Sequence, residues 1–130
     1  STYKLFTIAI FSELIRQLFP YFNKKSHIIN ISSIGGISGS SKFSGLSAYS
    51  SSKGALNILT EMLAEEFKDT GIRVNTLALG AVQTEMLEEA FPGYKANVSS
   101  IEMADFIYKF SLEGNTFFNG KIIPVSITNP

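Results

Sequence analysis

Apolar positions recur along the chain in two different spacings, and each spacing predicts its own kind of element. Helical spacing over residues 5–19, 47–68 and about 100–112 predicts three long helices. Three short β-branched runs, residues 27–32, 72–79 and 121–126, have the length and composition of strands in a parallel sheet. The order helix, strand, helix, strand, helices, strand predicts an α/β domain with right-handed crossovers.

Glycine, proline and serine mark the connections between these elements. Residues 34–45 lack periodicity and form a long loop after the first strand, and residues 80–83 form another after the second strand. We expect Gly71 to end the second long helix as a left-handed C-cap, and Thr84 to start a short helix through Glu89. Pro124 cannot donate a ladder hydrogen bond, which favours an edge position for the last strand.

Two helices carry apolar patterns that indicate which side faces the sheet. In the second long helix the inward stripe is Leu56, Leu59, Leu63 and Phe67. In the last helix we expect one side to hold Ile101, Ala104, Ile107, Tyr108 and Ser111. The first helix has apolar residues beyond a single face, so we expect it to need packing partners on two sides.

The predicted architecture is a doubly wound parallel sheet of the Rossmann-like type, of which the chain holds only the carboxy-terminal portion. Three strands with flanking helices leave one strand flank open, where further parallel strands normally continue. The sequence has no initiating Met and begins inside a helical pattern. We therefore expect residues 1–130 to be one partial domain, whose open flank is covered by missing strands or by a partner chain.

Composition and charge exclude several classes of function. Eleven basic and eleven acidic residues balance, so no field attracts nucleic acid or an anionic membrane. The chain has no cysteine and a single histidine, His27, which excludes thiol chemistry and leaves no metal site. The run Lys4–Phe11 imitates a short secretory signal, but Glu13 cuts it too short to cross a membrane. We expect a cytoplasmic protein that acts on a small molecule.

Tyr49 and Lys53 are the first candidates for chemistry. Four residues apart on a helix, they are neighbours on one face, where the ammonium favours the phenolate form of the tyrosine. Taken alone, this spacing more often marks a solvated helix face than a catalytic pair. Ser33 strengthens the chemical interpretation because it ends a predicted buried strand, where ligands of open α/β sheets collect. The alternative is that Ser33 only terminates the strand.

Four segments, in this order, resemble the short-chain dehydrogenase/reductase family. Ile28-Ile29-Asn30-Ile31-Ser32-Ser33 is similar to its catalytic-serine strand, and Tyr49-Ser50-Ser51-Ser52-Lys53 to its Tyr-x-x-x-Lys helix. Gly71-Ile72-Arg73-Val74-Asn75-Thr76 resembles the following strand, and Gly80-Ala81-Val82-Gln83-Thr84 the loop beside the nicotinamide. The resemblance extends from about Leu5 to Val125.

The resemblance implies an NAD- or NADP-dependent oxidoreductase that interconverts a carbonyl and an alcohol. It assigns Ser33 to orient the substrate oxygen, Tyr49 to act as acid/base, and Lys53 to hold the nicotinamide ribose. The residues implied to contact the cofactor are Tyr49, Lys53, Gly80, Val82 and Thr84. It also implies a homodimer or homotetramer, since family members commonly pair through the first and second long helices. The alternative is a non-catalytic scaffold that serves dimerisation or binding.

Several departures from the family pattern limit what is carried over. Leu79-Gly80 stands where the family usually has Pro-Gly, and the loop between Ser33 and Tyr49 is longer than the common form. Ser1 falls near the position of the family's helix-borne Asn. The glycine-rich turn that holds the pyrophosphate is absent, and Gly35–Gly39 does not replace it because no helix opens directly behind it. We therefore expect residues 1–130 alone to be inactive.

Substrate choice is expected to reside in the long loop and in residues 86–94. Met86, Leu87, Phe91 and Tyr94 suggest an apolar lid over the site. The alternative is that these side chains form the local core of a short helix.

Overall fold

A computed structural model describes residues 2–127, with side chains from Ile8 onward. The elements are α1 (Thr2–Leu18), η1 (Phe19–Tyr21), β1 (His27–Ser33), η2 (Ile34–Gly36), α2 (Ser47–Glu66), β2 (Arg73–Leu79), α3 (Glu85–Ala90), α4 (Ser100–Glu113), η3 (Gly114–Thr116) and β3 (Ile122–Val125). Here α denotes an α-helix, η a 3-10 helix and β a strand. The predicted fold class is confirmed: this is an α/β arrangement with three parallel strands and flanking helices.

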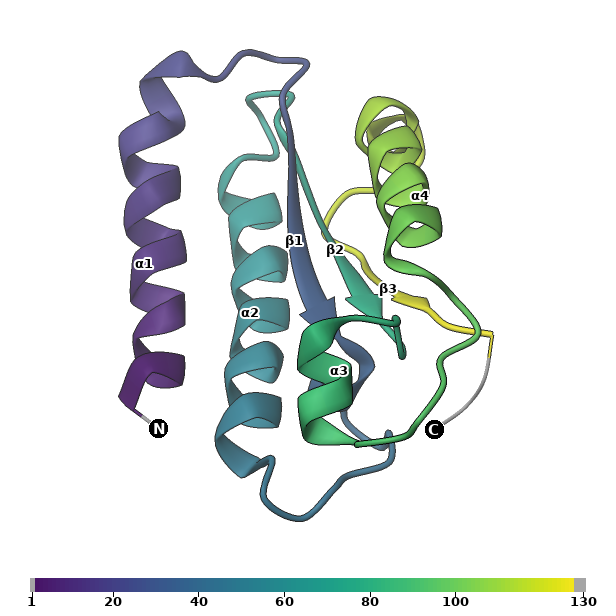
Figure 1. The fold of residues 1–130 in the computed structure, drawn as a ribbon. Helices are drawn as coiled ribbons and strands as arrows, with labels where there is room; N and C mark the ends of the chain where they lie inside the picture. The colour runs from purple at the N-terminus through teal and green to yellow at the C-terminus, as the bar shows by residue number, and fades with distance from the viewer. Residues whose placement is uncertain (1, 128–130) are drawn as a thin grey trace.

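The strands form one parallel sheet in the order β1-β2-β3 (Figure 1). Ser33 lies opposite Leu79, so β1 and β2 end at the same level of the sheet. Pro124 lies opposite Ala78 in β3, the outermost strand of the described sheet. The predicted edge position of Pro124 is therefore confirmed.

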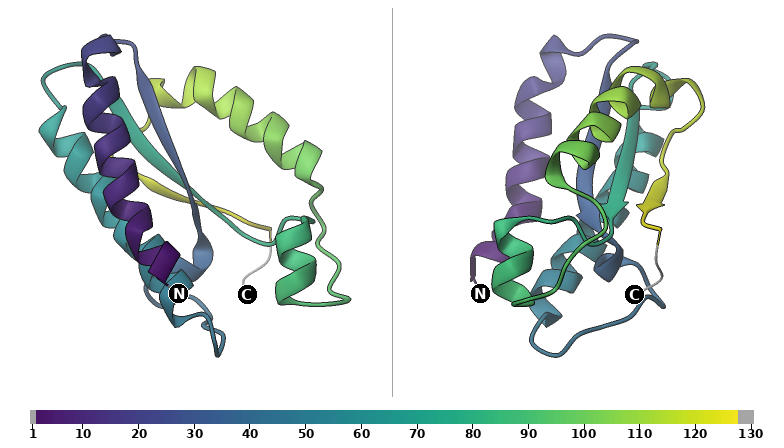
Figure 2. Two further views of the ribbon diagram at one scale, coloured as in Figure 1. Left: turned by 60° about the vertical axis from the view of Figure 1, so that its left-hand side comes forward. Right: turned by 45° about the vertical axis from the view of Figure 1, so that its right-hand side comes forward.

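Helices cover both faces of the sheet. Figures 1 and 2 show α1 and α2 side by side on one face and α4 on the other. Beneath α1 and α2 lies a core of Ile15, Leu63, Ala64, Ile72 and Val74, and Leu56 and Leu77 are also fully enclosed. Each valine, leucine or isoleucine side chain that is fully buried contributes about 1.5–3 kcal/mol to the stability of the fold. The inward stripe predicted for α2 is confirmed.

A buried polar chain fixes how α2 lies on the sheet. Asn30 of β1 donates from Nδ2 to Thr60 Oγ1 at 2.9 Å, and that oxygen lies 2.5 Å from Thr76 Oγ1 of β2. Thr60 also donates to the Leu56 carbonyl within the helix. Polar groups this deeply buried are costly unless paired, so these bonds select one rotation of α2. That rotation in turn places the first turns of α2, where Tyr49 and Lys53 lie.

Two predictions about helices are wrong in detail. Gly71 does have a positive φ of 84°, but α2 ends at Glu66 and its C-cap is Phe67. Gly71 belongs to the following turn, where a Cβ would lie 2.7 Å from the Lys24 carbonyl oxygen. On α4 the buried residue is Met103, while Ile101 and Tyr108 are exposed. Phe110, which contacts His27 and Phe118, points toward the sheet instead.

Element boundaries also shift slightly from those predicted. Thr84 is the N-cap of α3, accepting a hydrogen bond from the Leu87 amide, so the helix begins one residue later. The strand predicted over residues 121–126 pairs only from Ile122 to Val125. Ser99 and Glu102 form a complete capping box at the start of α4.

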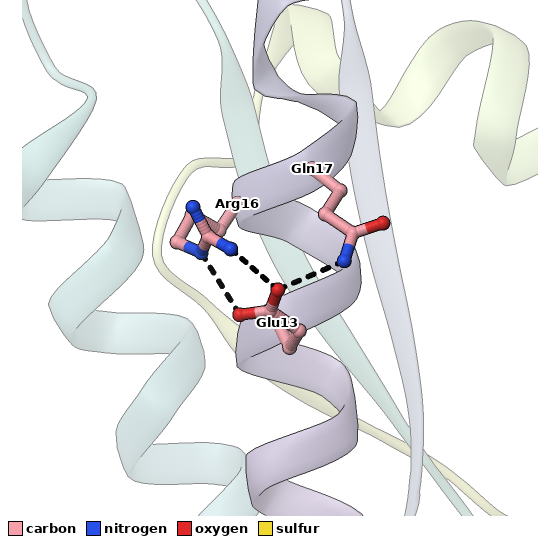
Figure 3. Close-up of polar contacts among 3 residues, drawn as sticks. All are labelled: Glu13, Arg16 and Gln17. Carbon is pink, nitrogen blue, oxygen red and sulfur yellow. Dashed lines mark hydrogen bonds and ion pairs between the residues drawn. The ribbon is translucent and has the colours of Figure 1, made fainter.

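The exposed side of α1 carries a small ionic network (Figure 3). Arg16 donates to the two carboxylate oxygens of Glu13 at 2.8 and 2.5 Å, and Gln17 donates to one of them at 2.8 Å. The hydrogen bond from Arg16, and then that from Gln17, lower the pKa of Glu13 to about 2. Because the group is exposed, solvent screens the pair and its contribution to stability is small.

Candidate functional site

The carboxyl ends of β1 and β2 bring the candidate residues to one edge of the sheet. Ser33 is the last residue of β1 and lies opposite Leu79, the last residue of β2. Gly80 follows directly after Leu79. In Figure 1 the start of α2 and the short helix α3 lie at this same end. This is the edge at which open parallel sheets bind ligands.

Ser33 has a defined local role as well as a candidate chemical one. Its Oγ accepts a hydrogen bond from the Gly35 amide at 3.1 Å and so caps η2. The oxygen serves as an acceptor in this bond, which leaves the hydroxyl hydrogen able to donate to another group. Ser33 is half-buried at the end of its strand. A side chain so held presents a hydroxyl with little freedom to move.

Tyr49 and Lys53 face inward from the first turns of α2 and are both partly buried. Lys53 Nζ lies 5.8 Å from the centroid of the Tyr49 ring and donates a long hydrogen bond, 3.4 Å, to the Ile31 carbonyl. Ser32 Oγ donates to the Lys53 carbonyl at 3.3 Å. These contacts hold Lys53 against β1, and both side chains of the pair are partly buried, which does not fit the alternative of a solvated face.

Burial acts directly on the lysine. Removing the ammonium from water lowers the pKa of Lys53 below its ordinary value of 10.5. No acidic side chain among the described residues forms a salt bridge with it. Within the part of the chain that the structure describes, a partly desolvated cation therefore lies beside Tyr49 with no salt-bridge partner.

The turn that follows Ser33 packs directly on α2. Asn57 Nδ2 donates to the Gly36 carbonyl at 3.4 Å, and a Cβ on Gly36 would lie 2.7 Å from Lys53 Cβ. The end of β1 is thereby joined to the helix that carries Tyr49 and Lys53. The structure thus brings Ser33, Tyr49 and Lys53 to the same corner of the fold. It also shows Gly35–Gly36 packed on a helix instead of opening one.

The predicted cofactor-side residues lie in the loop after β2. Gly80 donates its amide to the Val125 carbonyl at 2.9 Å, and a Cβ there would lie 2.6 Å from Ser126 Oγ. Glycine is therefore required at this position for the close approach to β3. Val82 is half-buried, and Thr84 is exposed and caps α3. Their contact with a cofactor stays a prediction.

The predicted lid is not a local core. No residue of α3 is buried, and Met86 and Tyr94 are largely exposed. Phe91 instead contacts Phe43 of the long loop edge to face, with 5.3 Å between ring centroids. Two segments far apart in the sequence therefore meet beside the site.

One hollow of the described surface lies apart from the candidate catalytic side chains. It is an open depression of about 540 Å³ between the long loop and the side of α2 that carries Ser47, Ser50, Ser51 and Gly54. Tyr49 and Lys53 do not line it. We assign the site from the convergence of side chains, which here is more informative than the depth of a surface depression.

Sequence reasoning missed two buried polar residues, Asn57 beside the site and Asn75 within β2. Asn57 is 8% exposed and holds the Gly36 turn. Asn75, fully buried, accepts from the Lys121 amide and donates to the Phe118 carbonyl, and its Nδ2 lies 3.0 Å from His27 Nε2. A polar residue within an apolar strand or on the inward side of a helix was the available signal, since such groups are buried only when paired.

Residues 2–127 lack both a metal-binding cluster and a membrane-spanning helix. No group of histidine, cysteine, aspartate or glutamate side chains within the described part of the chain is arranged to hold a metal ion. Over the same residues, no helix combines the length and the apolar character required to cross a bilayer.

A parallel α/β sheet with a strand-terminal serine and an inward-facing Tyr-x-x-x-Lys helix at one edge defines a dehydrogenase-type domain. The family model for short chain dehydrogenases matches residues 3–95. The chain belongs to this family. It is therefore a relative of known oxidoreductases, as the resemblance in sequence implied.

Individual relatives agree with this assignment. The chain is 33% identical over 125 residues to the uncharacterized oxidoreductase YmfI of Bacillus subtilis (strain 168), covering 87% of this chain and 50% of that protein. It is 43% identical over 72 residues to a diacetyl reductase [(S)-acetoin forming] of Staphylococcus aureus (strain N315), covering 55% of this chain and 27% of the reductase. The chain thus spans half or less of the length of these curated relatives.

A solved structure of a 4-hydroxyisoleucine dehydrogenase complexed with NADH is also similar. It superposes with a TM-score of 0.64 at 25% identity, covering 89% of this chain and 51% of that one. The similarity therefore includes nearly all of the described fold.

Proposed function

We propose that this chain carries the catalytic residues of an NAD(P)-dependent oxidoreductase that interconverts a carbonyl and an alcohol. The observation that carries the proposal is the packing of η2 on α2, which joins Ser33 to the helix of Tyr49 and Lys53. Membership of the short-chain dehydrogenase family supports the reaction class. The similar proteins that are named as a diacetyl reductase and as an NADH-bound dehydrogenase support the same class.

Each of the three residues has a role that its surroundings suit. The Ser33 hydroxyl donates to the substrate oxygen, where negative charge develops during reduction. The Tyr49 phenol gives that oxygen its proton, or removes the proton in the oxidative direction. Lys53 places its ammonium 5.8 Å from the centroid of the Tyr49 ring, one turn along the same helix.

The donors of this corner fit a nicotinamide dinucleotide. Within the described residues Lys53 Nζ makes one hydrogen bond, the 3.4 Å contact to Ile31, although an ammonium has three hydrogens to donate. The remaining donors match the hydroxyl oxygens of a ribose. When bound, the nicotinamide supplies or accepts the hydride, and the protein provides position and the proton.

The loop after β2 completes the cofactor side of the proposal. Gly80 brings the loop close to the end of β3, and Val82 and Thr84 follow directly. We assign Gly80, Val82 and Thr84 to the nicotinamide side on the strength of family membership. Because Gly35 and Gly36 pack on α2, they do not form a turn of the kind that binds pyrophosphate at a helix start. We therefore propose that this chain alone does not sustain turnover.

Self-association is the second part of the proposal. Large apolar side chains remain exposed at i, i+4 spacing on the two neighbouring helices: Ile10 and Leu14 on α1, and Ile58 and Met62 on α2. Helices with such uncovered stripes are suited to pairing with a second copy. We propose a homodimer or homotetramer that pairs through α1 and α2. A non-catalytic scaffold would use the same surface.

Turnover by the full-length protein tests the proposal and separates these alternatives. A panel of carbonyl substrates is assayed with NADH and NADPH by following cofactor absorbance. We expect reduction by the wild type, and a loss of about 100-fold or more in kcat for Tyr49→Phe with dinucleotide binding retained. Tyr108→Phe, on exposed α4, is the matched control and should be unchanged. Equal activity of wild type and Tyr49→Phe would overturn the assignment.

A further inference from the structure

The backbone of η2 lies in direct contact with the backbone of α2. A Cβ added to Gly36 would lie 2.7 Å from Lys53 Cβ and 2.8 Å from the Gly54 amide nitrogen. A Cβ added to Gly54 would lie 3.2 Å from the Gly36 carbonyl oxygen. Two glycines facing one another therefore set the separation between the turn and the helix, because any side chain at either position must push them apart.

Asn57 secures the same contact one turn further along α2. Its Nδ2 donates to the Gly36 carbonyl at 3.4 Å, and only 8% of the residue is exposed. Its Oδ1 is buried without a hydrogen-bond partner among the described residues. A buried amide with one unsatisfied atom destabilises the fold relative to an apolar side chain of similar size. Stability therefore does not account for an asparagine here, whereas its bond to Gly36 gives it a positioning role.

The turn is hydrogen-bonded directly to the candidate catalytic serine. Ser33 Oγ accepts from the Gly35 amide at 3.1 Å, and Gly36 is the next residue. Any movement of Gly36 away from α2 therefore carries Ser33 away from the helix of Tyr49 and Lys53. A second hydrogen bond, from Ser32 Oγ to the Lys53 carbonyl at 3.3 Å, also joins the end of β1 to α2.

We propose that Gly36, Gly54 and Asn57 are positioning residues that fix the Ser33 hydroxyl relative to Tyr49 and Lys53. This inference rests on the proposed function and adds to it the residues that hold the geometry. None of the three touches the reacting atoms. Their contribution arises because a displacement of about 1 Å in a catalytic group can cost about 100-fold in rate.

Gly54→Ala is the most informative single variant. Alanine stabilises the interior of a helix more than glycine does. A loss of activity in this variant is therefore not explained by a less stable helix. Its Cβ, however, presses on the Gly36 carbonyl. In the full-length protein we expect a melting temperature unchanged or raised and kcat lowered about fivefold or more, with the dinucleotide Kd within about twofold of wild type. Ser51→Ala, an exposed position on α2, is the control for helix propensity.

Gly36→Ala and a Ser33→Ala background show whether the effect passes through the serine. We expect Gly36→Ala to lower kcat about 10- to 100-fold in the wild type but to change it less than about twofold when Ser33 is already alanine. Asn57→Ala should behave like a weaker Gly36→Ala. An equal loss in both backgrounds would contradict a role through Ser33. So would wild-type kcat in Gly54→Ala.

The two proposals fail in different ways. Wild-type protein without carbonyl turnover contradicts the proposed function, whereas an active wild type with unchanged glycine variants contradicts only the positioning role. Crystal structures of wild type and Gly54→Ala test the positioning without any substrate. A longer Ser33 Oγ to Lys53 Nζ distance in the variant supports it, and an unchanged distance overturns it.

Discussion

The ammonium of Lys53 lies 5.8 Å from the centre of the Tyr49 ring, one turn away on the same face of α2. Its long hydrogen bond to the Ile31 carbonyl holds it against the outer strand β1. Burial lowers the pKa of this ammonium, and the described part of the chain provides no carboxylate to offset its desolvation. Such a group costs stability and is expected where chemistry requires a cation.

Replacing Lys53 should therefore separate stability from activity. A folded-state pKa below the ordinary 10.5 means that the charged form is disfavoured by folding, and this penalty is fully present at neutral pH. We expect Lys53→Met to leave the melting temperature of the full-length protein at pH 7 unchanged or raised, while kcat/KM falls about 100-fold or more. Differential scanning calorimetry and steady-state kinetics give the two values.

Lys68→Met is the matched control for the loss of a lysine, because Lys68 is exposed and its salt bridge among the described residues is the one with Glu65. It should change neither quantity. A fall in melting temperature for Lys53→Met with activity retained would show that Lys53 is a structural residue.

His27 gives a second prediction, on the dependence of stability on pH. Its Nδ1 donates to the Ser111 carbonyl at 3.3 Å and its Nε2 accepts from Asn75 at 3.0 Å, which describes a neutral ring. Burial lowers its pKa below the ordinary 6.5, and the bond to Ser111 opposes this only in part. The unfolded chain therefore binds a proton more readily than the folded one. Stability is full above pH 6.5 and declines as the pH falls below it.

Thermal unfolding between pH 8 and pH 5 checks this expectation. The wild type should lose melting temperature across this interval, and His27→Gln should show a smaller loss. Glu13→Gln is a control, since the pKa of Glu13, about 2, lies outside the interval. A steeper decline in His27→Gln than in wild type would contradict the neutral state of the ring.

The comparison of sequence and structure shows which interactions local patterns reveal. The inward side of α2 was predictable because its apolar residues form one stripe, and Tyr49 and Lys53 are neighbours in any α-helix. On α4, apolar residues surround the helix, so periodicity did not identify Met103 as the buried residue. The Gly36–Gly54 contact joins residues far apart in the chain through backbone alone, and no pattern of side chains indicates it.

A third prediction concerns the contact between Phe43 and Phe91, whose ring centroids are 5.3 Å apart. This pair links the long loop to the end of α3, so its loss should loosen the region beside the site. An aromatic pair contributes about 0.5–1.5 kcal/mol, which corresponds to about a two- to tenfold change in affinity. We expect Phe43→Ala to raise KM for the carbonyl substrate by that factor and to leave KM for the dinucleotide unchanged.

Phe117→Ala is the control for Phe43→Ala. Phe117 is 85% exposed and lies in the segment between η3 and β3, outside the Phe43–Phe91 contact. Steady-state kinetics with both substrates varied separates the two Michaelis constants. If KM for the dinucleotide rises while that for the carbonyl does not, the pair lies on the cofactor side and the lid assignment is wrong.

The last prediction concerns assembly through α1 and α2. Ile58 is 60% exposed in the middle of α2, the helix that lies beside α1. If a second copy covers this surface, a glutamate at position 58 buries an unpaired charge in the interface, which costs far more than the same charge in water. We expect Ile58→Glu to convert the full-length protein to a smaller species in sedimentation velocity, with secondary structure retained.

Ile101→Glu introduces the same charge at an even more exposed apolar position, on α4 at the opposite face, and should leave the sedimentation coefficient unchanged. The reverse result would move the interface to α4, and a wild type that sediments as a monomer would exclude pairing through either helix.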